Sequence, residues 1–202
     1  MLVIVDYGMG NLGSIKNMLK KLGHESIITS DIKIIGSATK LILPGVGAFD
    51  YGMKQIKELG FTEILNRKVL IEKVPVLGIC LGMQLMTQGS EEGIISGLGW
   101  IDAKACKFIS QTFKVPHMGW NTIDIQKESC LFEKNEEEKR FYFVHSYYIE
   151  CNDMQDIVAT TQYVVEFVSS FQKNNIYGVQ FHPEKSHKFG MNVLKRFMEL
   201  PC

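Results

Sequence analysis

The sequence predicts an α/β domain with a mostly parallel central sheet, flanked by helices and extended by antiparallel strands. In the first half, short apolar runs alternate with segments of helical period, which is typical of strand–helix–strand crossovers in a parallel sheet. In the second half, apolar runs follow one another closely, which indicates antiparallel hairpins. Hydrophobic residues make up 46% of the 202 residues. We therefore expect one domain over residues 1–202.

The first half begins with a strand at Leu2–Val5, followed by a helix over Asn11–Leu22 whose apolar residues recur at helical spacing. Gly23 ends this helix in the way that glycine commonly does. The remaining elements of this half are strands at Ser26–Thr29, Lys40–Leu43 and Val76–Ile79, and helices at Phe49–Leu59, at Phe61–Glu72 and from Leu81 onward.

The second half is dominated by β-branched and aromatic runs. We expect strands at Ala103–Phe108, Thr122–Ile125, Phe141–Val144, Ile157–Thr161, Val165–Phe171 and Ile176–Phe181. The charged run Glu133–Arg140 is typical of a solvated loop, and a last helix is expected over Ser186–Leu200.

Charge and composition exclude several classes of protein. Lys+Arg and Asp+Glu are balanced at 22 each, so the chain lacks the positive charge that nucleic-acid binding needs. No apolar run is long enough to span a membrane, and the N-terminus lacks the features of a signal peptide. The five cysteines show no CxxC pairing. We therefore expect reduced thiols in a cytoplasmic protein, with neither a disulfide framework nor a metal site.

A glycine pattern near the N-terminus matches a dinucleotide-binding fingerprint. Gly8–Gly13 reads G-x-G-x-x-G between a strand and a helix, and Asp31 follows Gly13 by 18 residues. Alone, this pattern favours a dinucleotide-binding oxidoreductase. However, Asp6 and Tyr7 separate the strand from the first glycine, and 202 residues leave no room for a separate substrate domain. The alternative is a strand-to-helix turn whose tip faces a partner or a ligand.

Gly78–Gly82 reads G-x-C-x-G where a strand meets a helix, and it is the thiol counterpart of a nucleophile elbow. Glycine on either side of Cys80 lets the strand and the helix pass closely. The N-terminus of the following helix favours the thiolate. The alternative is a buried, unreactive cysteine.

A base and an acid follow the last predicted strand. Pro183 favours an extended backbone at His182, so the side chains of His182 and Glu184 are expected on the same face. Glu184 would orient the imidazole while the other ring nitrogen faces Cys80, as in catalytic triads for acyl transfer. The carboxyl ends of parallel strands meet at one edge of the sheet, which would bring Cys80 and His182 together. The alternative is a surface segment without a chemical role.

Acyl transfer also requires an oxyanion hole. One donor is expected from the backbone N–H of Leu81. The other is expected from the segment Gly45, Val46 and Gly47, which follows a strand and whose glycines leave a peptide free to turn its N–H inward. The alternative is a plain turn at the end of a strand.

These residues lie within segments that resemble the class I, or triad-type, glutamine amidotransferases. More narrowly, nearly the whole chain is similar to the glutaminase subunits of imidazole glycerol phosphate synthase. The segments that carry the resemblance are Val5–Leu12, Pro44–Phe49, Gly78–Gln84, Pro116–Asn121, Val144–Tyr147 and Phe181–Ser186. The resemblance implies a flavodoxin-like variant of the α/β fold and no cofactor.

The resemblance also implies the reaction. Cys80 would attack the side-chain amide of glutamine and release ammonia, leaving a glutamyl thioester that water hydrolyses. His182 would protonate the ammonia and then activate the water. The residues whose positions match groups that hold glutamine are Gln84, Glu92, Ser146 and Tyr147. Taken without the resemblance, Glu92 is better explained as a surface residue, Gln84 as an ordinary helical residue, and Ser146 and Tyr147 by strand packing.

In the same family the glutaminase forms a heterodimer with a (β/α)8 barrel cyclase subunit, HisF. Ammonia passes between the two without meeting bulk water, and the cyclase makes imidazole glycerol phosphate and AICAR phosphate. Glutaminase activity is expected to stay low until the partner and its substrate bind, because a peptide in the 45–47 segment must rotate to complete the oxyanion hole. Positions that match the interface are Asn11, His117, Met118, Trp120 and Lys185. Trp120 could equally be part of the core.

Three positions depart from the pattern of the family: Trp100, Ala103 and His187. They leave open a paralogous glutaminase that supplies ammonia to another synthase, such as a sugar amidotransferase. A non-catalytic regulatory domain is a further alternative. The presence of Cys80 together with His182 and Glu184 argues against it.

Overall fold

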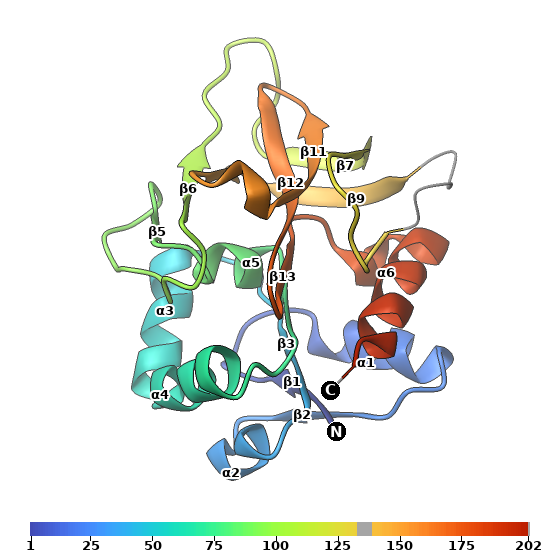
Figure 1. The fold of residues 1–202 in the computed structure, drawn as a ribbon. Coiled ribbons are helices and arrows are strands. Elements are labelled where there is room, and N and C mark those ends of the chain that lie inside the picture. The colour runs from blue at the N-terminus through green and yellow to red at the C-terminus, as the bar shows by residue number, and fades with distance from the viewer. Residues whose placement is uncertain (133–138, 202) are drawn as a thin grey trace.

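The computed structural model describes residues 1–132 and 139–201, and a large twisted sheet runs through its centre (Figure 1). Five parallel strands form one side of this sheet, in the order β2-β1-β3-β4-β13. They are β1 (Leu2–Val5), β2 (Ser26–Thr29), β3 (Lys40–Leu43), β4 (Val76–Ile79) and β13 (Ile176–Val179). Each of these strands was expected from an apolar run, and their parallel pairing confirms the predicted α/β class.

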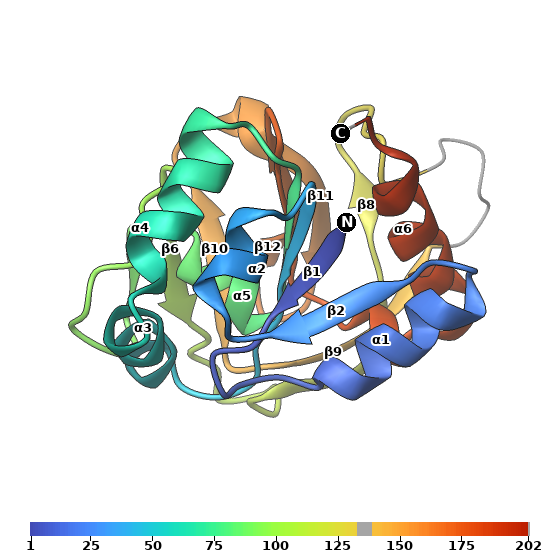
Figure 2. The ribbon, with the colours of Figure 1, turned by 90° about the horizontal axis from the view of Figure 1, so that it is seen from below.

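Helices cover both faces of the parallel strands, as Figure 2 shows for α3 and α4 on one side and α1 and α6 on the other. The helices are α1 (Leu12–Lys21), α2 (Ile32–Gly36), α3 (Phe49–Glu58), α4 (Phe61–Asn66), α5 (Leu81–Leu85) and α6 (His187–Glu199). A π-helical turn over Arg67–Ile71 follows α4, so the expected single helix over Phe61–Glu72 changes its winding after Asn66. Among the described residues, no helix is long and apolar enough to cross a membrane.

Further strands extend the sheet beyond β13, and all of their pairings are antiparallel except the parallel pairing of β5 with β6. The added strands are β5 (Gly89–Ser90), β6 (Ala103–Lys107), β8 (Asp124–Ile125), β10 (Tyr147–Cys151), β11 (Ile157–Gln162) and β12 (Glu166–Lys173). A separate two-stranded ribbon joins β7 (His117–Thr122) to β9 (Arg140–His145). The charged run predicted as a loop lies outside the described residues at positions 133–138, and its last residue, Arg140, begins β9.

One predicted strand was wrong, and several elements were missed. The strand expected over Thr122–Ile125 spans the end of β7 and the whole of β8, which pair with different partners. Half of the residues of β7 are polar, and of its six residues only His117 is buried, so the strand carries little apolar signal. The strand β10 and the short elements α2 and β5 were not expected.

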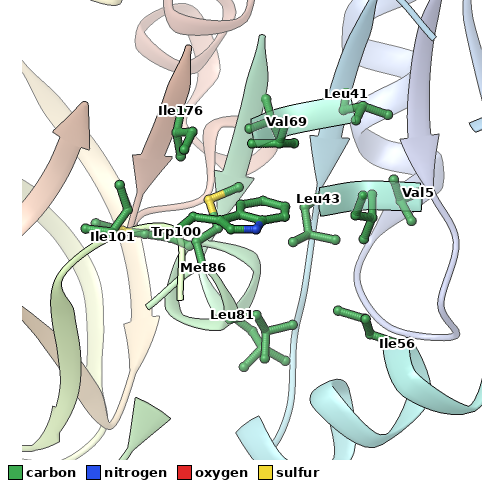
Figure 3. Packing of buried hydrophobic residues seen from close by; sticks show 14 of the residues in the cluster. Val5, Leu41, Leu43, Ile56, Val69, Leu81, Met86, Trp100, Ile101 and Ile176 are labelled. Carbon is green, nitrogen blue, oxygen red and sulfur yellow. The ribbon is translucent and has the colours of Figure 1, made fainter. Parts of the chain in front are cut away.

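The core consists of two clusters, one on each face of the sheet. Along β1, Val3 and Val5 belong to one cluster, while Leu2 and Ile4 belong to the other, because successive side chains of a strand point to opposite faces. Figure 3 shows part of the first cluster, in which side chains of the parallel strands pack with Trp100 and Met86. The Trp100 indole donates a hydrogen bond to the Asn66 side chain over 2.7 Å.

Candidate active site

Cys80 occupies a strained turn between β4 and α5. Its φ of 52° lies in the left-handed region, which costs a non-glycine residue about 1–3 kcal/mol. The flanking glycines are required by close packing. A Cβ on Gly82 would lie 1.8 Å from the carbonyl oxygen of Leu43, and one on Gly78 would lie 2.8 Å from the backbone of Met83. The turn therefore has the geometry of a nucleophile elbow.

His182 and Glu184 form a buried pair beyond the end of β13. The Nδ1 of His182 lies 2.8 Å from Oε1 of Glu184, and both side chains are 1% exposed. His182 is extended, as predicted, with φ −100° and ψ 98°. We expected this contact because alternate side chains of an extended segment share a face, and that explanation was wrong. Residues Pro183–Lys185 form a 3-10 turn, and this turn brings Glu184 back to the ring.

The thiol and the carboxylate together determine the charge of the imidazole. Burial alone lowers the pKa of His182, but its interactions with Cys80 and Glu184 outweigh burial and raise the pKa to about 10. The Nε2 atom is buried and makes no hydrogen bond within residues 1–132 and 139–201, although Cys80 is close enough to contribute to the shift.

A pocket of about 250 Å³ opens beside Cys80. It is smaller than the roughly 300–1,000 Å³ typical of sites for drug-sized ligands, so its size suits an amino acid. Its walls include all four residues expected to hold glutamine, which are Gln84, Glu92, Ser146 and Tyr147. Leu81, Val46 and Gly47 from the expected oxyanion hole also line it, together with Pro116, Val144 and His145.

Gln84 holds the pocket wall together. Its Nε2 donates to the carbonyl of Tyr147 over 3.1 Å and to Oε1 of Gln180 over 3.0 Å. Gln180 in turn directs its Nε2 at the Cys80 sulfur, 3.7 Å away. Sequence analysis missed Gln180, although it lies two residues before His182. Glu92 accepts a hydrogen bond from the backbone of Phe49 over 2.8 Å, and its side chain lies at the exposed rim.

The expected oxyanion segment packs against the elbow and against the loop after β1. Gly45 does not line the pocket, and a Cβ there would meet the Tyr7 hydroxyl at 2.5 Å and Leu81 Cβ at 2.8 Å. Gly47 has a φ of 122°, which favours glycine. The buried Tyr7 hydroxyl donates to the carbonyl of Pro44 and so fixes the peptide plane before Gly45. Sequence analysis assigned no role to Tyr7.

The glycine pattern near the N-terminus has a packing explanation. A Cβ on Gly10 would lie 3.2 Å from the backbone nitrogen of Gly45, so this loop approaches the oxyanion segment closely. Gly13 has nothing within 4 Å, whereas the third glycine of a dinucleotide fingerprint serves close helix packing. Asp31 caps α2 by accepting a hydrogen bond from the backbone of Lys33 over 2.7 Å. The geometry therefore gives no support to the dinucleotide alternative.

Four of the five expected interface residues are exposed at the surface, namely Asn11, Met118, Trp120 and Lys185. Met118 is 62% exposed and Trp120 is 42% exposed, so Trp120 is not a core residue. Its ring stacks on His187 at 5.5 Å between centroids. His117 differs from the other four because it is buried, with 3% of its surface exposed, and contacts His145.

Comparisons with known proteins place the chain in one family. The model of the family "Glutamine amidotransferase class-I" matches residues 3–200. Imidazole glycerol phosphate synthase subunit HisH 2 of Methanococcus maripaludis is 58% identical over 98% of this chain and 99% of its own. The protein of the same name from Pseudomonas aeruginosa is 46% identical over 99% of this chain and 100% of its own.

Solved structures share the fold. A crystal structure of a glutamine amidotransferase superposes with a TM-score of 0.74 at 17% identity, covering 98% of this chain and 97% of that one. A glutamine amidotransferase from Thermotoga maritima superposes with a TM-score of 0.67 at 16% identity, covering 98% of this chain and 80% of that one. The predicted fold class, including its likeness to this family, is confirmed.

Proposed function

Since the chain belongs to the class-I glutamine amidotransferase family, we propose that it is the glutaminase subunit of an imidazole glycerol phosphate synthase, with Cys80 as its nucleophile. The observation that carries the proposal is the strained Cys80 turn, which lies beside the buried pair of His182 and Glu184 and opens into a pocket of amino-acid size. The high identity to curated HisH subunits over the full chain supports the place in histidine biosynthesis.

The first half of the reaction makes a thioester. The Cys80 thiolate attacks the side-chain amide carbon of glutamine, and the developing oxyanion accepts hydrogen bonds from the Leu81 N–H and from a peptide within residues 45–47. Protonated His182 then donates its proton to the leaving nitrogen, so the C–N bond breaks and ammonia departs. Glu184 keeps the ring oriented and stabilises its positive charge.

The second half hydrolyses the thioester. Neutral His182 takes a proton from water as the water oxygen attacks the glutamyl carbon. The C–S bond breaks, glutamate leaves, and the thiolate and the imidazolium are restored. Each cycle consumes one glutamine and one water and releases one glutamate and one ammonia. His182 acts alternately as acid and base, which a pKa above its usual range and a carboxylate partner support.

Recognition of the amino-acid end of glutamine falls to the other side of the pocket. The Glu92 carboxylate at the rim suits the substrate ammonium, and backbone N–H groups of Ser146 and Tyr147 suit its carboxylate. Gln84 acts behind them by holding the carbonyl of Tyr147. No cofactor is required by this chemistry.

The proposed partner is a (β/α)8 barrel cyclase, HisF, that receives the ammonia. The exposed side chains of Met118 and Trp120 suit an interface because large apolar and aromatic residues are enriched there. Asn11 is exposed and its side chain makes no capping hydrogen bond at the start of α1, which leaves it suited to contact the partner. Lys185 completes this face, and His117 contributes from beneath it.

Partner binding would also activate the glutaminase by rotating a peptide in the 45–47 segment. This segment is a suitable switch because Gly47 adopts a left-handed φ and Val46 is 47% exposed, so little packing opposes rotation at its tip. We further propose that residues 1–202 act as one domain and that the protein works in the cytoplasm, where a thiolate nucleophile stays reduced.

The test is glutamate release from glutamine, measured with the chain alone and with a barrel cyclase and its nucleotide substrate. Cys80→Ala is the control. Strong stimulation that vanishes in the variant supports the proposal. Activity that this cyclase does not change would keep the chemistry but redirect the ammonia to another synthase. His187, which stacks on Trp120, is then the departure to examine, since Trp100 and Ala103 are buried in the core. No activity under any condition would overturn the mechanism.

A further inference from the structure

Two buried histidines that the reaction does not use lie beside the pocket. His117 begins β7 and His145 ends β9, and the two face each other directly across the ribbon. Only 3% and 6% of their surfaces are exposed. His145 Nδ1 lies 2.8 Å from the carbonyl oxygen of Tyr147, and its Nε2 lies 3.0 Å from Nδ1 of His117. Asn121 Nδ2 lies 3.3 Å from the remaining nitrogen of His117.

The contacts assign the protons. A carbonyl only accepts hydrogen bonds, so His145 must carry its proton on Nδ1. In a neutral ring its Nε2 then accepts, which places the His117 proton on Nδ1 as well. The second His117 nitrogen accepts from Asn121, whose side-chain oxygen is identified because it accepts from the backbone N–H of Thr122 over 2.8 Å. Every donor in this chain meets an acceptor.

Protonation of either ring would place two N–H donors face to face. Burial opposes this protonation, since it lowers the pKa of His117 to about 4 and that of His145 to about 3. Aromatic packing fixes the planes of the rings. His117 lies between Tyr163 at 4.0 Å and Phe143 at 4.9 Å, measured between ring centroids. Both histidines are therefore held neutral and in one orientation.

The direction of these hydrogen bonds shows what the two histidines can do. His145 and Gln84 both donate to the carbonyl of Tyr147. Both hydrogen bonds end on this carbonyl oxygen, which has no proton to pass on. The row of hydrogen bonds therefore cannot act as a proton relay. Instead, these hydrogen bonds fix the position of the backbone. The backbone N–H of Phe108 holds the preceding carbonyl, that of Ser146, over 3.0 Å. The peptide planes on both sides of Tyr147 are thus set.

We propose that His145 and His117 are positioning residues for glutamine, which fix the peptide after Tyr147 and so hold the adjoining N–H groups of Ser146 and Tyr147 in the orientation that binds the substrate carboxylate. The inference rests on the proposed function of that backbone. It predicts that disturbing the histidines weakens glutamine binding more than it slows the chemical step, because neither ring contacts the reacting atoms.

The first experiment needs no activity. Two-bond ¹H–¹⁵N spectra of the wild-type chain at pH 7 report the tautomer of each of its five histidines. We expect both rings to be neutral with the proton on Nδ1. A proton on Nε2, or a charged ring, at either position would overturn the proposal. This result stands even if the chain hydrolyses no glutamine, so it separates the failure of this inference from the failure of the proposed function.

The second experiment compares variants under the condition in which the wild type is most active. His145→Phe removes the donor to Tyr147 and should raise KM for glutamine about tenfold, the effect of losing one strong hydrogen bond, while kcat falls less. His145→Asn carries an amide nitrogen where Nδ1 was and should recover part of this loss. His24→Phe, outside the network, should match the wild type. Equal losses in the two His145 variants, or a loss confined to kcat, would overturn the proposal.

Discussion

Gly82→Ala adds one methyl group, and at this position a methyl group is expected to disturb the elbow more than at any other glycine of the turn. The added Cβ would lie 1.8 Å from the carbonyl oxygen of Leu43, against 3.4–4 Å for an ordinary contact, so the backbones must separate by about 1.6 Å. Leu43 cannot yield easily because it is paired with Gly78 in the β3–β4 ladder. Overpacking of this kind costs about 1–3 kcal/mol, and rigid backbone on both sides places Gly82→Ala near the upper end.

The matched control is Gly13→Ala. Gly13 lies in α1 with nothing within 4 Å of an added Cβ. Alanine there should stabilise the protein by about 0.5–1 kcal/mol, since it favours the helix. The same methyl group is thus expected to change the free energy of unfolding in opposite directions at the two sites, with a total difference of roughly 3–4 kcal/mol.

Urea unfolding followed by circular dichroism measures both variants. Glutaminase kcat/KM should fall in Gly82→Ala, because displacing α5 separates Cys80 from the oxyanion segment, and should not change in Gly13→Ala. A Gly82→Ala variant within about 1 kcal/mol of the wild type would refute the reasoning that close backbone packing requires glycine after the nucleophile. A destabilised Gly13→Ala would refute the reading of its surroundings as open.

Three further predictions concern single side chains. Tyr7→Phe leaves the Pro44 carbonyl without its buried donor and should cost about 1–3 kcal/mol in urea unfolding, with a lower kcat. Because folding raises the pKa of His182 from 6.5 to about 10, its contribution to stability is complete below pH 6.5 and is lost as the pH rises toward 10. Unfolding of His182→Gln should therefore depend less on pH than that of the wild type over this range, and equal slopes would contradict the shift. Trp120→Ala should leave stability within about 0.5 kcal/mol but weaken cyclase binding at least about tenfold, as isothermal titration would measure; unchanged affinity would exclude this face.

Local sequence signals predicted the parallel half of the fold well. The strands at Leu2–Val5, Lys40–Leu43 and Val76–Ile79 were predicted with their observed bounds, because central parallel strands are buried on both faces and read as unbroken apolar runs. The signal failed in the ribbon, where β7 buries only His117, and at β10, which is separated from β9 by a single residue.

The residues of the candidate site also fall into two groups, those that a local sequence pattern marks and those that it does not. Cys80 lies two residues from a glycine on either side, and His182 and Glu184 flank Pro183, so a local sequence pattern marks each of them. Gln180 and His145 have no such local mark, and the glycine beside Tyr7 and the proline beside His117 do not indicate what either side chain contacts. Their importance depends on contacts with residues far away in the sequence, such as the 100 positions between Gln180 and Cys80.

By itself, then, the sequence determined the α/β class, the order of the parallel strands and their helices along the chain, and the pattern that marks Cys80, His182 and Glu184 as candidates for the chemistry. These features follow from short-range patterns, namely hydrophobic period, turn residues and the elbow motif. Only the tertiary structure decided which side chains meet, that the Glu184 carboxylate reaches His182 through a 3-10 turn, and that His117 lies behind the surface rather than on it. The physical reason is that hydrogen bonds and burial join groups that are close in space, and one chain pattern is compatible with many such pairings until packing selects one.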